Sequence, residues 1–272
     1  MPHNINLELQ EPFTLAPGQV SFFKQNGFIK LKNVFSPETI AYLNETISKE
    51  VQRLNTQHLP LAERDTYGKA FLQIMNIWTK SEPVKEIVFS KRLAKIAADL
   101  LGVDGVRLYH DQALYKEPGG GITPWHADQY YWPLASDSTV TVWIPLQETP
   151  LEMGPLEFSS ESFKLTTGRD KEIGDESQQI LKETLAREGF EHVVEPFDLG
   201  EVSFHKGWLF HRAGANNTDK MRSVMTMIYM DKDMVLKQPE NKNQLLDWET
   251  WCPGAEVGKQ IDTPINPVLY EN

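Results

Sequence analysis

The sequence predicts a mainly β fold, a barrel or jelly roll, with helices packed against it. Residues 1–104 carry mostly helical patterns, whereas residues 105–272 carry many short β-branched or aromatic runs separated by turn residues. No internal repeat or linker divides the two parts. A chain of 272 residues is within the range of one barrel with added helices. We therefore expect a single domain over residues 1–272.

The helical pattern of the first part is clearest after residue 36. Ser36-Pro37-Glu38 supplies an N-cap, a proline at the first helical position and an early acidic residue. The residues that follow form an apolar stripe at steps of three and four: Ile40, Leu43, Ile47, Val51 and Leu54. Two more helices are expected over residues 82–89 and 91–101, with Gly102 ending the second. A short strand is expected before them, over residues 27–31.

The second part consists of short runs bounded by Gly, Pro, Asp and Ser. The expected strands lie at residues 106–109, 112–115, 139–146, 197–204, 208–214 and 222–231. Residues 176–188 interrupt this series with a helical pattern, so we expect a helical insertion there. Many short strands separated by turns favour a barrel or jelly roll.

Composition argues against several classes of partner. The formal net charge is −11 at pH 7, and such a surface repels phosphate backbones and anionic lipids. We therefore do not expect nucleic acid as a partner. We do not expect a membrane either, because no apolar run reaches the roughly 18 residues of a membrane span. The single cysteine, Cys252, excludes an intrachain disulfide and CxxC-type chemistry. The N-terminus has no secretory-signal pattern, so we expect a cytoplasmic protein.

The strongest chemical signal is the sequence Trp125-His126-Ala127-Asp128. Side chains on a strand alternate between faces, so His126 and Asp128 are expected to offer two adjacent ligands to a metal. His211 is the best candidate for the third ligand. Two histidines and one carboxylate leave three coordination positions open, which is typical of non-haem iron(II) oxygenases. A hydrolytic zinc centre is the second interpretation, and His-x-Asp alone also occurs by chance in many proteins.

Arg222 adds a second half to this pattern. It follows His211 by eleven residues, and the intervening segment 215–220 is rich in turn-forming residues. We expect the flanking strands to form a hairpin that aims His211 and Arg222 into the barrel. A guanidinium near a metal suits bidentate binding of a carboxylate. The alternative for Arg222, taken alone, is an ion pair at the rim.

In order, these motifs resemble the phytanoyl-CoA dioxygenase family of iron(II)- and 2-oxoglutarate-dependent oxygenases. The matching segments are 112–119, His126-Ala127-Asp128, 141–146 (TVWIPL), 153–156 (MGPL), 210–214 (FHRAG) and Arg222. With the helical first third, the resemblance covers most of the chain. It implies a double-stranded β-helix, a jelly-roll and cupin-like core, with helices packed outside.

The resemblance also implies a role for each matching residue. It assigns the iron ligands to the metal pattern: His126, Asp128 and His211. Arg222 would bind the distal carboxylate of 2-oxoglutarate, and Gln112 and Trp143 would make further contacts with that co-substrate. Trp143 would equally suit a core, and Gln112 would equally suit the solvent. The expected cofactors and co-substrates are Fe(II), 2-oxoglutarate and O2.

Two departures from the family pattern change details of the expected site. The family often has Pro-Gly-Ser-His after the Gly-Pro-Leu turn, whereas this chain has Ser159-Ser160-Glu161-Ser162-Phe163-Lys164. The neighbouring loop is therefore expected to differ in shape. The family often has a serine two residues after the distal histidine, where this chain has Ala213, so one hydroxyl contact to the co-substrate is expected to be missing.

Other residues near this pattern are candidates for the pocket. His110 and His205 are competing ligands, but each is expected to be a hydrogen-bonded pocket or core histidine. The aromatic segment 129–133, with Trp125 before it, either lines a substrate pocket or packs in the barrel. Three residues are candidates for closing the pocket from the helical part: Met75, Asn76 and Trp78.

The sequence therefore predicts a dioxygenase that hydroxylates a small organic molecule and releases succinate and CO2. Three other functions stay open: a cupin-like metal enzyme that does not use 2-oxoglutarate, a zinc hydrolase and a non-catalytic small-molecule binding protein. A position of Arg222 outside the barrel would favour the first of these. Both a monomer and a dimer are compatible with the sequence.

Overall fold

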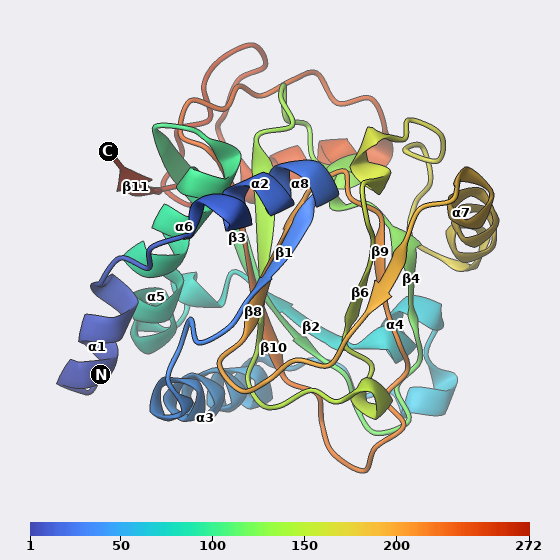
Figure 1. The fold of residues 1–272 in the computed structure, drawn as a ribbon, viewed down its shortest axis with the longest axis horizontal. Helices are drawn as coiled ribbons and strands as arrows, with labels where there is room; N and C mark the ends of the chain where they lie inside the picture. The colour runs from blue at the N-terminus through green and yellow to red at the C-terminus, as the bar shows by residue number, and fades with distance from the viewer.

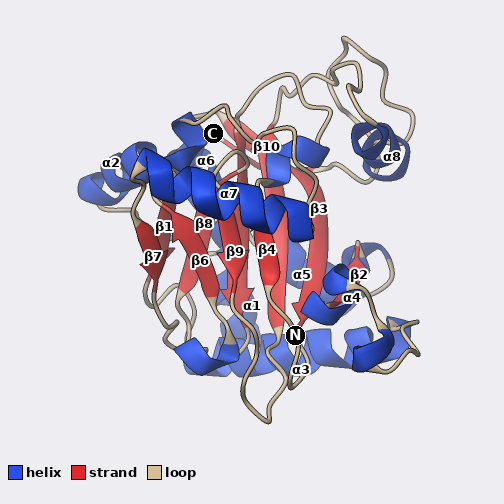
Figure 2. Ribbon diagram, turned by 90° about the vertical axis from the view of Figure 1, so that its right-hand side faces the viewer, coloured by secondary structure: helices blue, strands red, loops and turns tan.

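A computed structural model describes residues 1–272 and contains two antiparallel β-sheets that lie against each other (Figures 1 and 2). The larger, seven-stranded sheet has the order β1-β8-β5-β10-β3-β11, with β2 beside β3. Its strands are β1 (Phe28–Leu31), β2 (Leu72–Met75), β3 (Gly105–Tyr115), β5 (Thr139–Pro145), β8 (Val202–Lys206), β10 (Val224–Asp231) and β11 (Val268–Glu271). The smaller, four-stranded sheet has the order β4-β9-β6-β7. Its strands are β4 (Thr123–His126), β6 (Leu156–Ser159), β7 (His192–Val194) and β9 (His211–Ala213).

The chain alternates between the two sheets for most of its second half. It passes from β3 to β4, back to β5, across to β6, and later from β8 to β9 to β10. This alternation closes two sheets around one interior and confirms the predicted double-stranded β-helix core.

Helices cover the outer faces of both sheets. The helices are α1 (His3–Gln10), α2 (Pro17–Asn26), α3 (Pro37–Leu54), α4 (Thr66–Ala70), α5 (Glu82–Val88), α6 (Lys91–Leu101), α7 (Asp175–Glu188) and α8 (Lys242–Trp251). The single-turn 3-10 helices are η1 (Leu61–Glu63), η2 (Ile77–Thr79), η3 (Asp128–Tyr131), η4 (Leu151–Met153) and η5 (Ser162–Lys164). Helices α1, α3, α5 and α6 gather on the large sheet, whereas α7 packs against β4 of the small sheet (Figures 1 and 2). No helix combines the length and the apolar character needed to cross a membrane.

The helices form where the sequence predicts them. At the start of α3 the Ser36 hydroxyl accepts a hydrogen bond from the Thr39 N–H at 3.2 Å, as expected of an N-cap. The predicted apolar stripe supplies the buried face of α3: Ile40, Leu43, Ile47 and Val51. Gly102 ends α6 in the left-handed conformation, with a φ of 72°. Helix α7 lies at the predicted insertion. Helices α1, α2, α4 and α8 are additional to the prediction.

Three strand predictions are corrected. The runs 106–109 and 112–115 form one continuous strand, β3. The predicted strand 197–204 begins later, at Val202, and Phe197 makes only an isolated bridge to Thr149. The hairpin between His211 and Arg222 is wrong, because β9 belongs to the small sheet and β10 to the large one.

The turn-forming residues after β9 explain this third correction. Asn216 donates its side-chain amide to the carbonyls of Lys116 and Glu117, at 3.1 and 3.2 Å. Its backbone N–H donates to the carbonyl of Gly120. The segment is therefore held by the turn that follows β3 instead of folding back on β9, and the chain crosses to the other sheet.

Candidate metal centre and pocket

His126 and His211 face each other across two neighbouring strands. They are register partners in the antiparallel pair of β4 and β9, and their ring centroids lie 4.2 Å apart. Directly opposed residues of such a pair share one face of the sheet. The pairing of two distant segments therefore brings the two imidazoles together.

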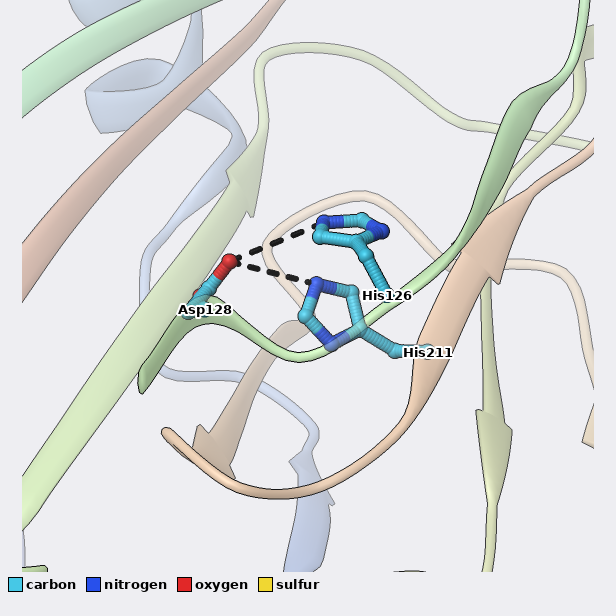
Figure 3. Close-up of side chains that lie close together, drawn as sticks. All are labelled: His126, Asp128 and His211. Atoms are coloured by element: carbon cyan, nitrogen blue, oxygen red, sulfur yellow. Dashed lines mark ion pairs between the residues drawn. The ribbon is translucent and has the colours of Figure 1, made fainter. Parts of the chain in front are cut away.

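Asp128 reaches the same point by a different route from the predicted one. Strand β4 ends at His126, and Asp128 begins the 3-10 turn η3 instead of continuing the strand. Ala127 between them remains extended, with φ −125° and ψ 130°. The Oδ1 atom of Asp128 lies 3.6 Å from Nε2 of each histidine (Figure 3). One donor atom from each of the three residues lies within 4.8 Å of the others.

Backbone contacts orient both imidazoles. Nδ1 of His126 donates to the carbonyl of Pro124 at 2.7 Å, and Nδ1 of His211 donates to the carbonyl of Leu209 at 2.9 Å. Because a carbonyl can only accept, the proton sits on Nδ1 and the Nε2 lone pair faces Asp128. Burial lowers the pKa of each histidine to about 4, so both are neutral at pH 7.

The second oxygen of Asp128 is held from the large sheet. Thr141 donates its hydroxyl to Oδ2 at 2.9 Å, and Nε2 of His205 lies 3.3 Å from the same oxygen. His205 is therefore a hydrogen-bonded pocket histidine, as expected, and its Nε2 is engaged by the carboxylate. Burial on its own raises the pKa of Asp128, but the adjacent His211, His205 and His126 hold it below its usual value.

This donor set fits a divalent transition metal. Two neutral imidazole nitrogens and one carboxylate oxygen converge from buried or half-buried side chains, and all three are oriented by further hydrogen bonds. No fourth protein ligand joins them. An open coordination sphere of this kind suits a catalytic metal better than a structural zinc site with four protein ligands.

A cavity of about 660 Å³ contains these three residues. Its wall on the large sheet comes from two rows of register partners across β3, β10, β5 and β8. The first row is His110, Ile228, Thr141 and His205. The second row is Gln112, Thr226 and Trp143. The alternate residues of β5 point the other way, into the core beneath the helices: Val140, Val142 and Ile144.

Arg222 lines the same cavity without an acidic partner. It is 1% exposed, and Nη1 donates to the carbonyl of Gly154 at 2.5 Å. Its Nε has no hydrogen-bond partner, and it forms no salt bridge. Burial lowers the pKa of Arg222 to about 9, so the guanidinium keeps its charge at pH 7. The alternative of an ion pair at the rim is therefore wrong.

Gly154 is required for this contact. Its φ is +70°, and a Cβ at this position would collide with the backbone of Gly214. The close approach places the Gly154 carbonyl against Arg222. The segment MGPL of the sequence thus contributes a backbone acceptor to the cavity wall.

Gln112 and Trp143 both lie on the cavity wall, on the same row. The Gln112 side chain accepts a hydrogen bond from Nε2 of Gln73 at 2.5 Å, so it does not face bulk solvent. Trp143 is 2% exposed, packs on Phe197 with 4.7 Å between ring centroids, and lies 5.6 Å from the Arg222 guanidinium. It combines a core contact with a cavity contact.

The remaining pocket candidates divide into two groups. His110, Tyr131, Trp132 and Met75 line the cavity. Trp125 packs instead with Leu181 and Leu185 of α7, outside the cavity. Asn76 and Trp78 are also outside it, because the loop that carries them bonds to the buried Asp111.

The two departures from the family pattern have local consequences. Ala213 lines the cavity and offers no hydroxyl there. Residues 159–164 end β6 and form the turn η5, in which Glu161 has a φ of 65°. The Ser162 hydroxyl accepts a hydrogen bond from the N–H of Phe210 at 3.0 Å. This contact fixes the residue that precedes His211.

Sequence reasoning missed the wall that α8 contributes. Four residues at steps of three and four, with Trp251 beside them, face the cavity: Asn243, Leu246, Asp247 and Thr250. Two signals were available, this spacing and Asn241, whose side chain caps α8 by accepting from the N–H groups of Asn243 and Gln244. Residues before and within β2 were missed as well: Asp65, Tyr67, Phe71 and Gln73.

Comparison with known proteins gives relatives in sequence and solved structures of the same fold. A probable alpha-ketoglutarate-dependent hypophosphite dioxygenase of Stutzerimonas stutzeri is 22% identical over 230 residues, covering 78% of this chain and 77% of that protein. The carbocyclase SnoK from nogalamycin biosynthesis aligns with a TM-score of 0.76 and 22% identity, over 95% of this chain and 99% of its own.

The epimerase SnoN, solved in complex with Fe3+, alpha-ketoglutarate and nogalamycin RO, aligns with a TM-score of 0.75 and 22% identity. That alignment covers 93% of this chain and 98% of SnoN. Residues 23–224 match the family described as phytanoyl-CoA dioxygenase (PhyH). This match spans most of the sequence and includes all the residues of the metal pattern and Arg222, and the chain therefore belongs to the phytanoyl-CoA dioxygenase family.

Proposed function

We propose that this protein is an iron(II)- and 2-oxoglutarate-dependent dioxygenase that hydroxylates a small organic molecule. The observation that carries the proposal is the set of residues that line one cavity. Three converging metal donors and a buried guanidinium without an acidic partner line the same space. A metal with open positions beside a fixed cation suits a co-substrate that has a chelating end and a distal carboxylate.

In this proposal His126, Asp128 and His211 hold the iron. Two neutral imidazoles and one carboxylate leave three positions for the co-substrate and O2. Bound iron, together with 2-oxoglutarate, would supply the activation of O2 that side chains cannot provide. Thr141 and His205 keep Asp128 in place by holding the oxygen that does not face the histidines.

Arg222 binds the distal carboxylate of 2-oxoglutarate in this proposal. Its Nε lacks a partner, and no protein carboxylate competes for the guanidinium. A buried cation left in this state is favourable only when a ligand supplies the counter-charge. Trp143, 5.6 Å from the guanidinium, and Gln112 on the same row would flank the co-substrate.

The rest of the cavity would bind the organic substrate and exclude water. Its volume of about 660 Å³ is in the range of small-molecule sites. Tyr131 and Trp132 supply apolar wall directly after the metal pattern. Holding the reacting carbon close to the metal is the main contribution that such walls make to the rate.

Two of the alternative functions are disfavoured by particular residues. A cupin-like enzyme that does not use 2-oxoglutarate would have no need of Arg222 inside the cavity. A pure binding protein would have no need of three converging donors with fixed tautomers. Related proteins named as a carbocyclase and an epimerase indicate that the outcome on this fold varies, so the product must be analysed directly.

The test is succinate release from 2-oxoglutarate, measured with Fe(II) and O2 across a panel of small organic molecules. We expect release to require both iron and O2, and the stimulating molecule to gain the mass of one oxygen. His211→Ala should abolish release, whereas His58→Ala, a change at an exposed histidine outside the cavity, should not. Release that persists in His211→Ala would contradict the proposed centre. A product that loses two hydrogens instead would replace hydroxylation by desaturation or ring closure.

A further inference from the structure

Two chemically different sets of residues line the cavity. One set is the metal donors and Arg222, with Trp143 and Gln112. The other set comes from α8, which presents Asp247 and Trp251, and from residues 172–173. Tyr131 fixes that last segment, because its hydroxyl accepts a hydrogen bond from the N–H of Ile173 at 2.9 Å.

The proposed function gives a role to only some of the charged residues that line the cavity. Five lining residues have a formal charge: Asp65, Asp128, Glu172, Arg222 and Asp247. The proposed function uses Asp128 and Arg222. The space that remains for the substrate therefore offers three carboxylates and no lysine or arginine. An anionic group in that space would meet like charges without a compensating cation.

Among the three carboxylates, Asp247 is the one that is free to bind a ligand. Asp65 caps α4 by accepting from the N–H of Gly68 at 2.7 Å. Glu172 pairs with the surface residue Lys242 at 3.4 Å. Asp247 is half-buried and has no cationic partner. Its Oδ2 accepts a hydrogen bond from the Tyr109 hydroxyl at 3.0 Å, and its carboxylate also accepts one from the Trp251 side chain. Its other lone pairs remain available to a donor in the cavity.

Aromatic side chains of the cavity wall lie near Asp247. His110 is 4% exposed and belongs to this wall. The His110 ring lies 5.1 Å from the ring of Trp251. Trp132 also lines the cavity, and its ring lies 5.6 Å from the ring of Tyr109.

We propose that the substrate carries a protonated amine, which donates to the carboxylate of Asp247 while its apolar substituents lie against Trp251 and Trp132. A carboxylate beside aromatic rings is the combination that favours an ammonium group, through a charge-assisted hydrogen bond and through cation–π attraction. The net charge of −11 favours the approach of a cation from solution.

This inference rests on the proposed function for the assignment of Arg222 and Asp128, and its test does not depend on turnover. The probes are amines such as tryptamine and N,N-dimethylbenzylamine, each beside the alcohol and the carboxylate of the same skeleton. For tryptamine these are tryptophol and indole-3-acetate. Dissociation constants are measured without oxygen, on protein loaded with Fe(II) and 2-oxoglutarate. The same measurement is repeated on protein that contains neither Fe(II) nor 2-oxoglutarate.

We expect the amines to bind more tightly than their alcohols, and the carboxylates to bind most weakly. Asp247→Asn should weaken amine binding by roughly tenfold or more, the loss expected of a charge-assisted hydrogen bond, and should leave the alcohols within about twofold. The matched control is Glu249→Gln, an exposed acid on the same helix outside the cavity, which should change neither.

Two outcomes overturn the inference. One is that no amine binds more tightly than its alcohol counterpart, and the other is that Asp247→Asn leaves the amine preference intact. Failure of the proposed function gives a different result. In that case Asp247-dependent amine binding persists although no molecule of the panel stimulates succinate release.

Discussion

The hydroxyl of Thr141 lies 2.9 Å from Oδ2 of Asp128 and thereby determines which carboxylate oxygen faces the two histidines. Thr141 belongs to the large sheet, whereas the strand that leads to Asp128 belongs to the small one. The contact therefore links the two sheets at the candidate metal centre. Oδ1, the oxygen left free, is the atom that lies 3.6 Å from both Nε2 atoms.

This contact predicts a positioning role for Thr141. Thr141→Val keeps the shape of the side chain and removes the donor, so we expect iron affinity to fall by about tenfold or more, as for other residues that orient metal ligands. Thr141→Ser restores the hydroxyl and should restore most of the affinity. Competition with a chelator under anaerobic conditions measures both. Equal iron affinity in the valine variant and the unmodified protein would show that Asp128 does not need this support.

Replacing either histidine of the centre should remove bound iron without unfolding the protein. His126→Ala and His211→Ala each delete one of three donors, and the remaining two cannot hold the metal tightly. Far-ultraviolet circular dichroism should remain unchanged, and metal analysis after anaerobic loading should show less than one iron per chain. His58→Ala provides the exposed-histidine control. Full iron occupancy in both cavity variants would mean that the ligands lie elsewhere.

Arg222 should affect the co-substrate and not the metal. Arg222→Leu removes the buried guanidinium, and loss of its contact with a carboxylate should cost about 2–3 kcal/mol, or roughly 30- to 150-fold in affinity for 2-oxoglutarate. Iron content should stay the same. Arg222→Lys keeps the charge but not the planar fork, so its affinity should be intermediate. An unchanged requirement for 2-oxoglutarate in the leucine variant would show that a different residue binds the distal carboxylate.

Asp247 gives amine binding a pH dependence of defined sign. Burial raises the pKa of Asp247 to about 7, so the carboxylate gains its charge as the pH rises through neutrality. Four titratable neighbours stay neutral in this range, because burial raises the pKa of Tyr109, Tyr67 and Cys252 and lowers that of His110 to about 4.

Affinity for an amine probe should therefore increase from pH 6 to pH 8 by up to about tenfold. The corresponding alcohol should show no such change. Isothermal titration at three pH values measures this, and in Asp247→Asn the increase should disappear. Amine binding that weakens as the pH rises would contradict the assignment.

The sequence predicted that His126, Asp128 and His211 lie together, because their signal is local or ordered along the chain. His126 and Asp128 are two residues apart, and His211 stands in a motif of its own. The expected reason for their convergence was that His126 and Asp128 lie on one strand, and this is wrong for Asp128. Asp128 lies in a 3-10 turn and not on the strand, and it meets the histidines because Ala127 stays extended.

The position of Arg222 shows where sequence reasoning fails. The turn-rich segment 215–220 suggested a hairpin, but Asn216 bonds to the turn after β3, and the chain crosses between sheets. Turn propensity is a local property, whereas the partner of the turn is set by a contact 100 residues away in the sequence. The wall formed by α8 depends in the same way on how a distant helix docks onto the core, which no local pattern specifies.

The binding of 2-oxoglutarate in the absence of oxygen tests the central claim most directly. The titration uses protein with and without one equivalent of Fe(II), and it includes Arg222→Leu. We predict that one 2-oxoglutarate binds per chain, that tight binding requires the iron, and that the leucine variant binds it at least tenfold more weakly. Binding that is equally tight without iron, or no binding to the iron-loaded protein, would contradict a site built from His126, Asp128, His211 and Arg222.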